Sequence, residues 1–269
     1  MRRTIIFIFS ALMLIPCMSY AGDMNKEVGI VAHRGFWNCK EAGYAKNSIA
    51  ALRCAQEAGF WGSEFDVNMT ADSVLLVYHD SDIRGKKIEK HPYSEFANDT
   101  LANGERIPTI DQYLEQGAKY PETMLVYELK GHSSDEVEDL FVDLSIAKLE
   151  EHGLLHPMRV MFISFSLHMC EVLARKLPEF TVQFLGSSKS PEDLAQMGIY
   201  GVDYNHGVFL LHGSWHGQAQ SRYMSINSWT VNSKGDMKRI LEMGVDQITT
   251  DNPLEARELI KEMNITELR

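Results

Sequence analysis

Two acidic residues, Glu64 and Asp66, are separated by one residue within 62–67, a segment that predicts a strand. Because side chains alternate along a strand, both carboxylates point to one side of it and Phe65 points to the other. Two neighbouring carboxylates that face a protein interior repel each other and are costly to remove from water. A hard divalent cation with oxygen ligands, Mg²⁺ or Ca²⁺, removes that cost.

Glu128 ends a further predicted strand, 124–129, and offers a third carboxylate. An isolated Glu-x-Asp pair is more often two ordinary edge charges, or a partner for a cation such as Arg34. Three carboxylates at adjacent strand ends, beside two histidines, instead favour a metal site. The sequence therefore predicts that Glu64, Asp66 and Glu128 bind a divalent cation, either Mg²⁺ or Ca²⁺.

His33 and His79 each follow a short apolar segment, 28–32 and 74–78, that predicts a strand. Imidazole titrates near neutral pH, so these two residues are the candidates for proton transfer. A lone histidine is more often structural or simply exposed. The expected convergence of the two strand ends favours the catalytic interpretation for this pair.

Arg34 and Lys130 add two cations beside these carboxylates and histidines. Two cations, a metal and two histidines are the parts of a site for phosphoryl transfer, because the positive charges neutralise phosphate oxygens while the imidazoles exchange protons. Trp229, near the end of a later strand, offers a flat apolar wall to a substrate, and core packing is the equal alternative. His206 and His212 follow the sixth predicted strand and are further candidates for the same end of the sheet.

The elements that would position these residues alternate along the chain. Eight strand–helix units are present when 74–78 is treated as an insertion after the second strand. Such repetition predicts a parallel sheet covered by helices, and eight units in about 250 residues match a closed (β/α)8 TIM barrel. The C-terminal ends of barrel strands meet at one mouth, where the candidates above are expected. An open doubly wound sheet is the alternative, but no glycine-rich phosphate loop follows the first strand.

The boundaries of these elements follow from apolar periodicity and from turn residues. The predicted strands are 28–32, 62–67, 74–78, 124–129, 160–165, 181–185, 201–204, 225–231 and 246–250. The predicted helices are 47–59, 134–152, 167–176, 191–197, 214–223, 234–243 and 253–263. The stretch 70–109, rich in His, Asp, Lys and Asn, predicts an elaborated loop on one face.

The composition limits the function classes. The chain has 269 residues, 45% of them hydrophobic and 23% charged, which is typical of a globular protein and excludes disorder or a bundle of membrane spans. Its net charge is −11, so it lacks the electrostatic footprint of a nucleic-acid binder. No linker or low-complexity segment interrupts 22–269, which is predicted to be one domain.

The N-terminus has the pattern of a targeting segment. Arg2 and Arg3 precede an apolar run, 5–16, and Ser19-Tyr20-Ala21 follows with small residues at its first and third positions. This order predicts a signal peptide, 1–21, cleaved after Ala21, and hence a periplasmic or secreted protein without a membrane span after cleavage. A lipoprotein, on the basis of Leu14-Ile15-Pro16-Cys17, and a retained membrane anchor are the alternatives.

Cleavage after Ala21 leaves Cys39, Cys54 and Cys170 in the mature chain. Three thiols allow at most one internal disulfide, and the sequence does not say which pair would form it. Their spacing does not match a metal site or a disulfide scaffold.

Eight short motifs, taken together, carry a family resemblance. In chain order they are His33-Arg34-Gly35, Asn47-Ser48, Glu64-Phe65-Asp66-Val67, Leu76-Val77-Tyr78-His79-Asp80, Tyr127-Glu128-Leu129-Lys130, Phe162-Ile163-Ser164-Phe165, Ser228-Trp229-Thr230-Val231-Asn232 and Thr250-Asp251-Asn252-Pro253. Their combination, over roughly 28–259, resembles the signature of glycerophosphodiester phosphodiesterases. Any single motif is unspecific.

The resemblance implies a (β/α)8 barrel with a small insertion after the second strand. It implies cleavage of a small-molecule glycerophosphodiester to glycerol 3-phosphate and an alcohol, through attack of the glycerol 2-hydroxyl on phosphorus and opening of the cyclic phosphate by water. By position it assigns the acid/base pair to His33 and His79, the metal ligands to Glu64, Asp66 and Glu128, and phosphate contacts to Arg34 and Lys130.

One position departs from the family pattern. Lys46 precedes Asn47-Ser48, where the family usually has Glu, and this reversal of charge bears on the metal environment or on the substrate headgroup. Two other functions compete with the hydrolase. One is a related barrel lyase that acts on choline-type phospholipids and stops at the cyclic phosphate. The other is an exported binding protein without activity, which the complete set of catalytic positions argues against.

Overall fold

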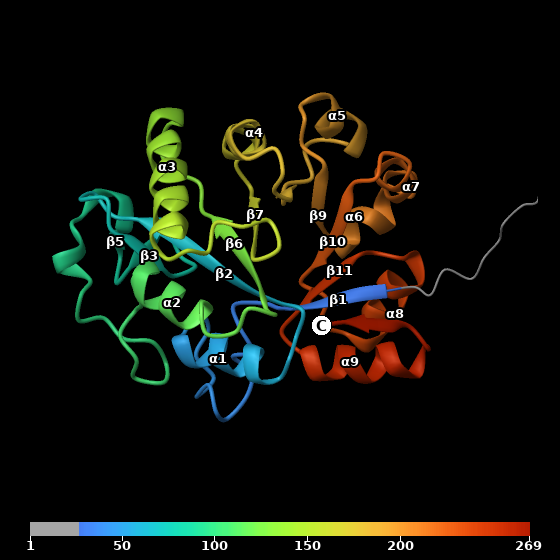
Figure 1. The fold of residues 1–269 in the computed structure, drawn as a ribbon, viewed down its shortest axis with the longest axis horizontal. Helices are drawn as coiled ribbons and strands as arrows, with labels where there is room; N and C mark the ends of the chain where they lie inside the picture. The colour runs from blue at the N-terminus through green and yellow to red at the C-terminus, as the bar shows by residue number, and fades with distance from the viewer. Residues whose placement is uncertain (1–26) are drawn as a thin grey trace, which may run out of the picture.

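The computed structural model describes residues 27–269, so the predicted signal peptide and its cleavage site lie outside the described residues. Eight parallel strands form a closed barrel in the order β1, β2, β6, β7, β8, β9, β10 and β11, and β11 pairs with β1 to complete the ring. Helices cover the outside of these strands (Figure 1). The predicted (β/α)8 barrel is confirmed.

The barrel strands are β1 (Glu27–Ala32), β2 (Gly62–Met69), β6 (Met124–Leu129), β7 (Val160–Ser164), β8 (Val182–Phe184), β9 (Gly201–Asn205), β10 (Ser225–Trp229) and β11 (Gln247–Thr250). The helices are α1 (Ile49–Glu57), α2 (Ile110–Gly117), α3 (Asp135–Glu151), α4 (Leu167–Lys176), α5 (Pro191–Gln196), α6 (His206–Leu211), α7 (Trp215–Gln220), α8 (Lys234–Met243) and α9 (Pro253–Glu262).

Apolar side chains on both faces of the strands hold the barrel together. An inner cluster fills the barrel and consists of Val31, Val126, Met161, Ile163 and Leu185. A larger cluster packs the strands against the surrounding helices. Burial on both faces is the normal state of a parallel barrel strand, and it explains the apolar runs of β1, β6 and β7. In β2 the buried residues include Glu64 and Asp66.

Side-chain caps fix where many of the helices begin. A serine or threonine side chain accepts a hydrogen bond from the backbone of the first turn in α1, α2, α3, α4, α5 and α8. The capping residues are Ser48, Thr109, Ser134, Ser166, Ser190 and Ser233. Such caps satisfy backbone N–H groups that have no partner within the helix.

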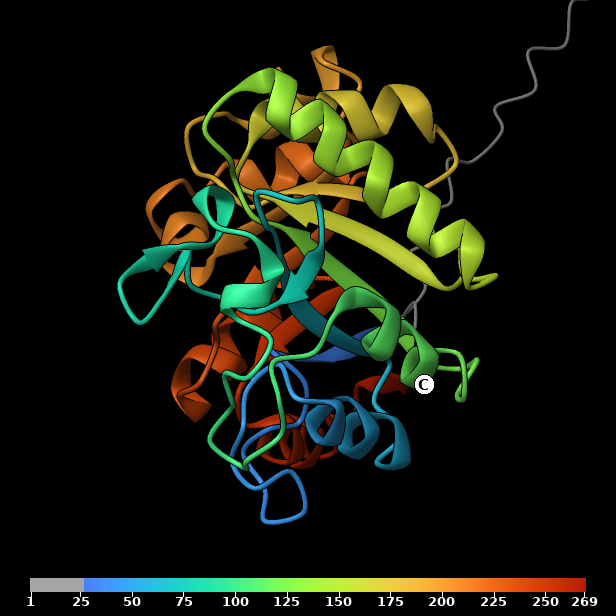
Figure 2. The same cartoon turned by 90° about the vertical axis from the view of Figure 1, so that its left-hand side faces the viewer.

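The insertion after β2 is a small polar unit with its own core. It contains β3 (Leu75–Val77), antiparallel to β2, the hairpin β4 (Asp82–Ile83) and β5 (Lys86–Lys87), and two 3₁₀ turns, η1 (Ile88–Lys90) and η2 (Tyr93–Glu95). Its apolar cluster is Leu76, Ile83, Ile88, Phe96 and Ile107. Figure 2 shows this unit, in teal, beside the barrel strands. The elaborated loop that the sequence predicts over 70–109 is therefore a folded cap on one side of the mouth.

Outside the insertion, three elements are absent from the sequence prediction. The helix α2 follows the insertion, and although Ile110, Tyr113 and Leu114 have helical spacing, the pattern is only eight residues long. The helix α6 precedes α7, where a single helix over 214–223 was expected. The C-terminal strand β12 (Thr266–Leu268) pairs with the start of β1, a contact between chain ends that periodicity does not reveal.

Within 27–269 the three cysteines are free. Cys39 and Cys54 belong to one small apolar cluster beside α1. Burial, together with a hydrogen bond to the Cys39 thiol, raises the pKa of Cys54 to about 12. In this part of the chain no helix has both the length and the apolar character needed to span a bilayer.

Candidate active site

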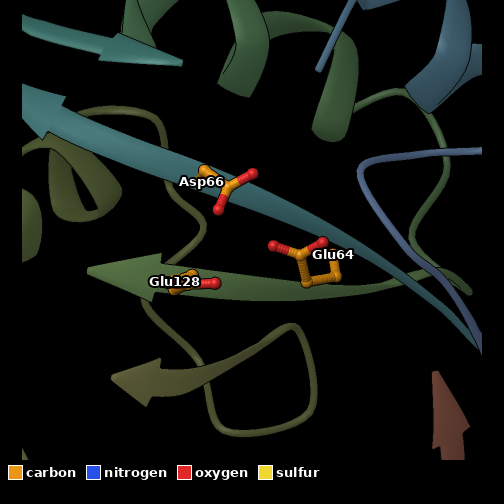
Figure 3. Close-up of side chains that lie close together, drawn as sticks. All are labelled: Glu64, Asp66 and Glu128. Carbon is orange, nitrogen blue, oxygen red and sulfur yellow. The ribbon is translucent and has the colours of Figure 1, made fainter. Parts of the chain in front are cut away.

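The three predicted metal ligands lie together inside the barrel. Glu64 and Asp66 project from β2, and the register of the sheet pairs Asp66 with Glu128 on β6. One oxygen from each carboxylate lies within 4.8 Å of the others, and all three side chains are buried (Figure 3). The spacing of two residues along β2 thus gives the shared orientation that the sequence predicts.

Two cations border this carboxylate cluster. The Lys130 Nζ donates to Glu128 Oε1 at 2.7 Å and to Asp66 Oδ1 at 3.2 Å. The Arg34 Nε lies 3.5 Å from Asp66 Oδ2. Three carboxylates therefore share two side-chain cations, and one negative charge is left without a partner.

The loop before α1 holds the cluster from the side. The Asn47 amide donates to Asp66 Oδ2 at 2.8 Å, and its carbonyl oxygen accepts from the Asp66 backbone N–H at 3.2 Å. Asn47 and Arg34 both have a left-handed backbone, φ 58° and φ 57°, which is uncommon for residues other than glycine. This turn aims the Arg34 backbone N–H at Glu64 Oε2, 2.7 Å away. Ser48, next in the chain, caps α1 and fixes the loop.

The pKa values of the three carboxyls differ because their neighbours differ. Burial raises the pKa of Glu64 well above its ordinary value, and the neighbouring carboxylates add to the rise. Burial and Asp66 raise the pKa of Glu128 to about 7. Burial would also raise the pKa of Asp66, but Lys130, His79 and Arg34 hold it below its usual range. In the absence of another cation, protons take up the unpaired charge.

The cluster has the chemistry of a cation site. It offers only oxygen ligands, which suit Mg²⁺ or Ca²⁺. Among residues 27–269, Glu64 Oε1 is buried without a hydrogen-bond partner, as expected of an oxygen that a ligand would contact. Glu64, Asp66 and Glu128 could therefore hold a metal ion, and its positive charge would favour the ionised form of the carboxyls.

His33 follows β1 and is oriented by a carboxylate from the neighbouring strand end. Its Nδ1 lies 2.8 Å from Asp251 Oδ1, and the same carboxyl accepts from Trp37 Nε1 at 2.9 Å and from Asn232 Nδ2 at 2.7 Å. Burial alone would raise the pKa of Asp251, but these hydrogen bonds hold it well below its usual range. An ionised Asp251 accepts only, so Nδ1 of His33 carries the proton and Nε2 is left to accept one.

His79 follows β3 in the insertion and makes a similar pair with an adjacent residue. Its Nδ1 lies 2.7 Å from Asp80 Oδ1. Burial lowers the pKa of His79, although the nearby Asp66 carboxylate opposes this shift. The insertion therefore brings the second histidine to the carboxylate cluster, which the barrel strands alone do not do.

A cavity of about 230 Å³ joins these groups to an apolar wall. The wall consists of Ile163, Phe165, Leu185 and Trp229. The Trp229 and Phe165 rings pack edge to face at 5.4 Å, and Trp229 Nε1 donates to the Asp203 backbone carbonyl at 2.8 Å. Trp229 both packs against the inner core and lines the cavity, and its contact with a substrate stays a prediction.

The structure adds residues to which sequence reasoning gave no role. Asp251 and Asn47 lie in the quoted motifs, and their contacts with His33 and Asp66 become visible only in three dimensions. Asp203 on β9 lines the cavity with its Oδ1 buried and unpartnered among the described residues, and burial raises its pKa well above the usual value. In the sequence, the position of Asp203 within a predicted strand was the only sign that it could face the barrel interior. His206 and His212 do not line this cavity.

The comparison with known families agrees with this geometry. The sequence model of the glycerophosphoryl diester phosphodiesterase family matches residues 33–255, which include every candidate residue described above. The chain belongs to this family.

Relatives in the glycerophosphoryl diester phosphodiesterase family cover nearly the whole chain. A glycerophosphodiester phosphodiesterase structure from Parabacteroides distasonis is 38% identical, covers 89% of this chain and 98% of its own, and superposes with a TM-score of 0.85. The glycerophosphodiester phosphodiesterase of Caldanaerobacter subterraneus is 26% identical over 83% of this chain and 94% of its own. A phosphodiesterase from Oleispira antarctica, solved with sn-glycerol-3-phosphate, shares the fold with a TM-score of 0.75. It is 21% identical and covers 87% of this chain and 96% of its own.

Proposed function

We propose that this chain is a phosphoric diester hydrolase that cleaves glycerophosphodiesters to sn-glycerol 3-phosphate and an alcohol, with Mg²⁺ or Ca²⁺ as its cofactor. Family membership supports the reaction, and the product bound to the Oleispira antarctica relative is consistent with it. The observation that carries the proposal is the buried carboxylate cluster, bordered by two cations and lying in one cavity with two histidines.

Each residue has a role that follows from its contacts. Glu64, Asp66 and Glu128 would hold the cation, which when bound supplies charge neutralisation for the phosphate. Arg34 and Lys130 bind the phosphate oxygens, because both cations border the cavity, and the neighbouring carboxylates raise the pKa of Lys130. Trp229 contacts the carbon skeleton of the substrate.

The two histidines exchange protons with the reacting oxygens. His33, with its Nδ1 proton held by Asp251, accepts the proton of the attacking hydroxyl at Nε2. His79 donates to the leaving alcohol from its protonated form, which the Asp66 carboxylate and the Asp80 hydrogen bond favour against the lowering effect of burial on its pKa. Its position in both cavities of the mouth gives it access to that alcohol. After the alcohol departs, the roles reverse as water opens the cyclic phosphate.

Phosphorus NMR of a reaction with glycerophosphoglycerol tests the proposal. We expect accumulation of glycerol 3-phosphate with Mg²⁺ or Ca²⁺ present, with a cyclic phosphate at most as a transient. A stable cyclic phosphate would favour the lyase instead. The absence of any turnover under either cation would leave only a binding protein.

We also propose that the protein is exported, on the basis of Arg2, Arg3, the apolar run and Ser19-Tyr20-Ala21. Mass spectrometry of the protein expressed with its native N-terminus should give a mature chain that begins at Gly22. An intact Met1 in the cell-associated fraction would contradict export by cleavage, and a lipid-modified Cys17 would favour the lipoprotein.

A further inference from the structure

A second cavity opens beside the first and shares Arg34 and His79 with it. Its volume is about 300 Å³. Its remaining lining comes from the loop before α1 and from the insertion: Tyr44, Lys46, Asn47, Tyr78, Asp80, Thr100, Leu101 and Ala102. We call it the Lys46 cavity. A phosphodiester whose phosphate lies at Arg34 and His79 places one of its two substituents in each cavity.

The construction of the two cavities indicates which substituent each one takes. The first is built on the ends of the barrel strands, with fixed walls such as Ile163 on β7 and Trp229 on β10. It suits the part that is common to all substrates, the glycerol. The Lys46 cavity is built from loops, which vary more readily than the strands of a barrel. It suits the alcohol, which differs from one substrate to the next.

Lys46 has no acidic partner in this cavity. Its Nζ lies 4.5 Å from the centre of the Trp37 ring, a cation–π contact, and within 27–269 no carboxylate lies at ion-pairing distance from it. The one acidic side chain that lines the cavity, Asp80, is hydrogen-bonded to His79. Arg34 adds a second positive charge. Arg34 and Asp80 already have partners in Asp66 and His79, whereas Lys46 lies in the lining of this cavity without an opposite charge from the described residues beside it.

This charge pattern opposes a cationic alcohol. Trp37, the indole beside Lys46, already has the Lys46 ammonium over its face, so it cannot receive the ammonium of choline or ethanolamine there. The side chains of Tyr44 and Tyr78 supply phenolic hydroxyls, which can bond to a polyol or to an anionic oxygen.

We propose, resting on the proposed function, that the Lys46 cavity binds the leaving alcohol and that Lys46 selects alcohols without net positive charge, with those bearing an acidic group bound best. The substrates of this chain are then diesters of glycerol 3-phosphate with polyols or with phosphorylated or carboxylated alcohols. Diesters of choline are poor substrates.

The test compares kcat/KM for three diesters that differ in the charge of the leaving alcohol: glycerophosphocholine, glycerophosphoglycerol and glycerophosphoglycerol phosphate. For the wild-type protein, kcat/KM should be highest for the diester with the anionic alcohol, lower for the neutral one and lowest for the cationic one. In Lys46→Glu the ratio of choline to glycerol diester should rise about tenfold at low ionic strength, the scale of a charge reversal at an exposed site close to the bound alcohol. Lys46→Gln should give a smaller rise, and about 0.5 M salt should reduce both.

Lys261→Glu is the matched control, because it makes the same change in net charge. Lys261 is exposed in the last turn of α9, which runs from the mouth towards the opposite end of the barrel. This variant should leave the ratio unchanged. Each ratio compares two substrates of the same protein. A general loss of activity caused by a disturbed Lys46–Trp37 contact therefore lowers both kcat/KM values alike and leaves their ratio unchanged.

Two outcomes would overturn the inference, and they differ from failure of the proposed function. The first is a wild-type preference for the choline diester. The second is an unchanged ratio in Lys46→Glu with full turnover of all three diesters. If no diester is hydrolysed by any variant, the proposed function and this inference fall together.

Discussion

The two sides of the barrel mouth differ in their chemistry. The side formed by β1, β2, β3 and β6 presents almost all of the charge: His33, Arg34, Glu64, Asp66, His79, Glu128 and Lys130. The side formed by β7, β8 and β10 presents Ile163, Phe165, Leu185 and Trp229. One cavity connects them, so a substrate contacts both.

This contrast indicates that the two sides of the mouth have different roles, one in the chemical step and one in substrate binding. Buried charges are costly unless they have a partner, and Lys130, which directly follows β6, provides one for both Asp66 and Glu128. The apolar side excludes water from the same space, which strengthens the electrostatic interactions opposite it. We therefore expect substitutions on the charged side to reduce the chemical step, and those on the apolar side to weaken binding.

The largest effect should come from the histidines on the charged side. His33→Ala and His79→Ala should each lower kcat by about 10²-fold or more, the usual scale for loss of a general acid or base. Both side chains face the cavity, so the melting temperature should stay near the wild-type value. Steady-state kinetics and thermal unfolding measure the two quantities. Losses well below tenfold in both variants would contradict their roles in proton transfer.

An intermediate effect should come from the apolar wall. Trp229→Ala should raise KM about tenfold and change kcat less, because the ring contacts carbon atoms away from the reacting phosphorus. Tyr223→Ala is the control, since Tyr223 is 95% exposed and precedes β10 at the opposite end of the barrel. A fall in kcat without a change in KM would mean that Trp229 contributes to the chemical step rather than to substrate binding.

The smallest effect concerns stability without metal. Glu128 has a folded-state pKa of about 7, above its unfolded value of about 4.3, so its contribution to stability is complete below the unfolded pKa and is lost as pH rises through the folded one. The melting temperature of the metal-free protein should fall by about 5 °C between about pH 5 and pH 8. The pKa of Asp66 is lowered, so its contribution to stability is lost as pH falls, and this loss occurs only at pH values below its ordinary pKa.

Two measurements sharpen this prediction. Glu128→Gln should flatten the pH dependence, because the amide does not ionise. Added Mg²⁺ or Ca²⁺ should restore the melting temperature of the wild-type protein more at pH 8 than at pH 5. An equally steep fall in Glu128→Gln would assign the pH effect to other buried carboxyls with a raised pKa, such as Glu64 or Asp203.

The sequence predicted the charged side better than the details that hold it. Period-two spacing along β2 was enough to bring Glu64 and Asp66 to one face, and apolar runs with their turns were enough for the barrel. The contacts of Asn47 with Asp66 and of Asp251 with His33 join segments 19 and 218 residues apart. No local pattern encodes such pairs.

The insertion and the second cavity were the least predictable parts. The short strands and turns over 75–95 depend on packing around Leu76 and Phe96, which periodicity does not show in segments of two or three residues. The sequence did mark Lys46 as unusual. Only the folded loop shows that it lies over Trp37 and borders a cavity shared with His79.

Calorimetric titration of the metal-free protein with Mg²⁺ or Ca²⁺, with activity measured on the same samples, tests the central claim most directly. The account predicts one bound cation per chain and recovery of activity in parallel with binding. Glu64→Gln should weaken binding strongly, while Trp229→Ala should bind the cation as the wild-type does. Full activity in excess chelator, or cation binding unaffected by Glu64→Gln, would contradict the claim that the charged side of the mouth is a metal-dependent catalytic site.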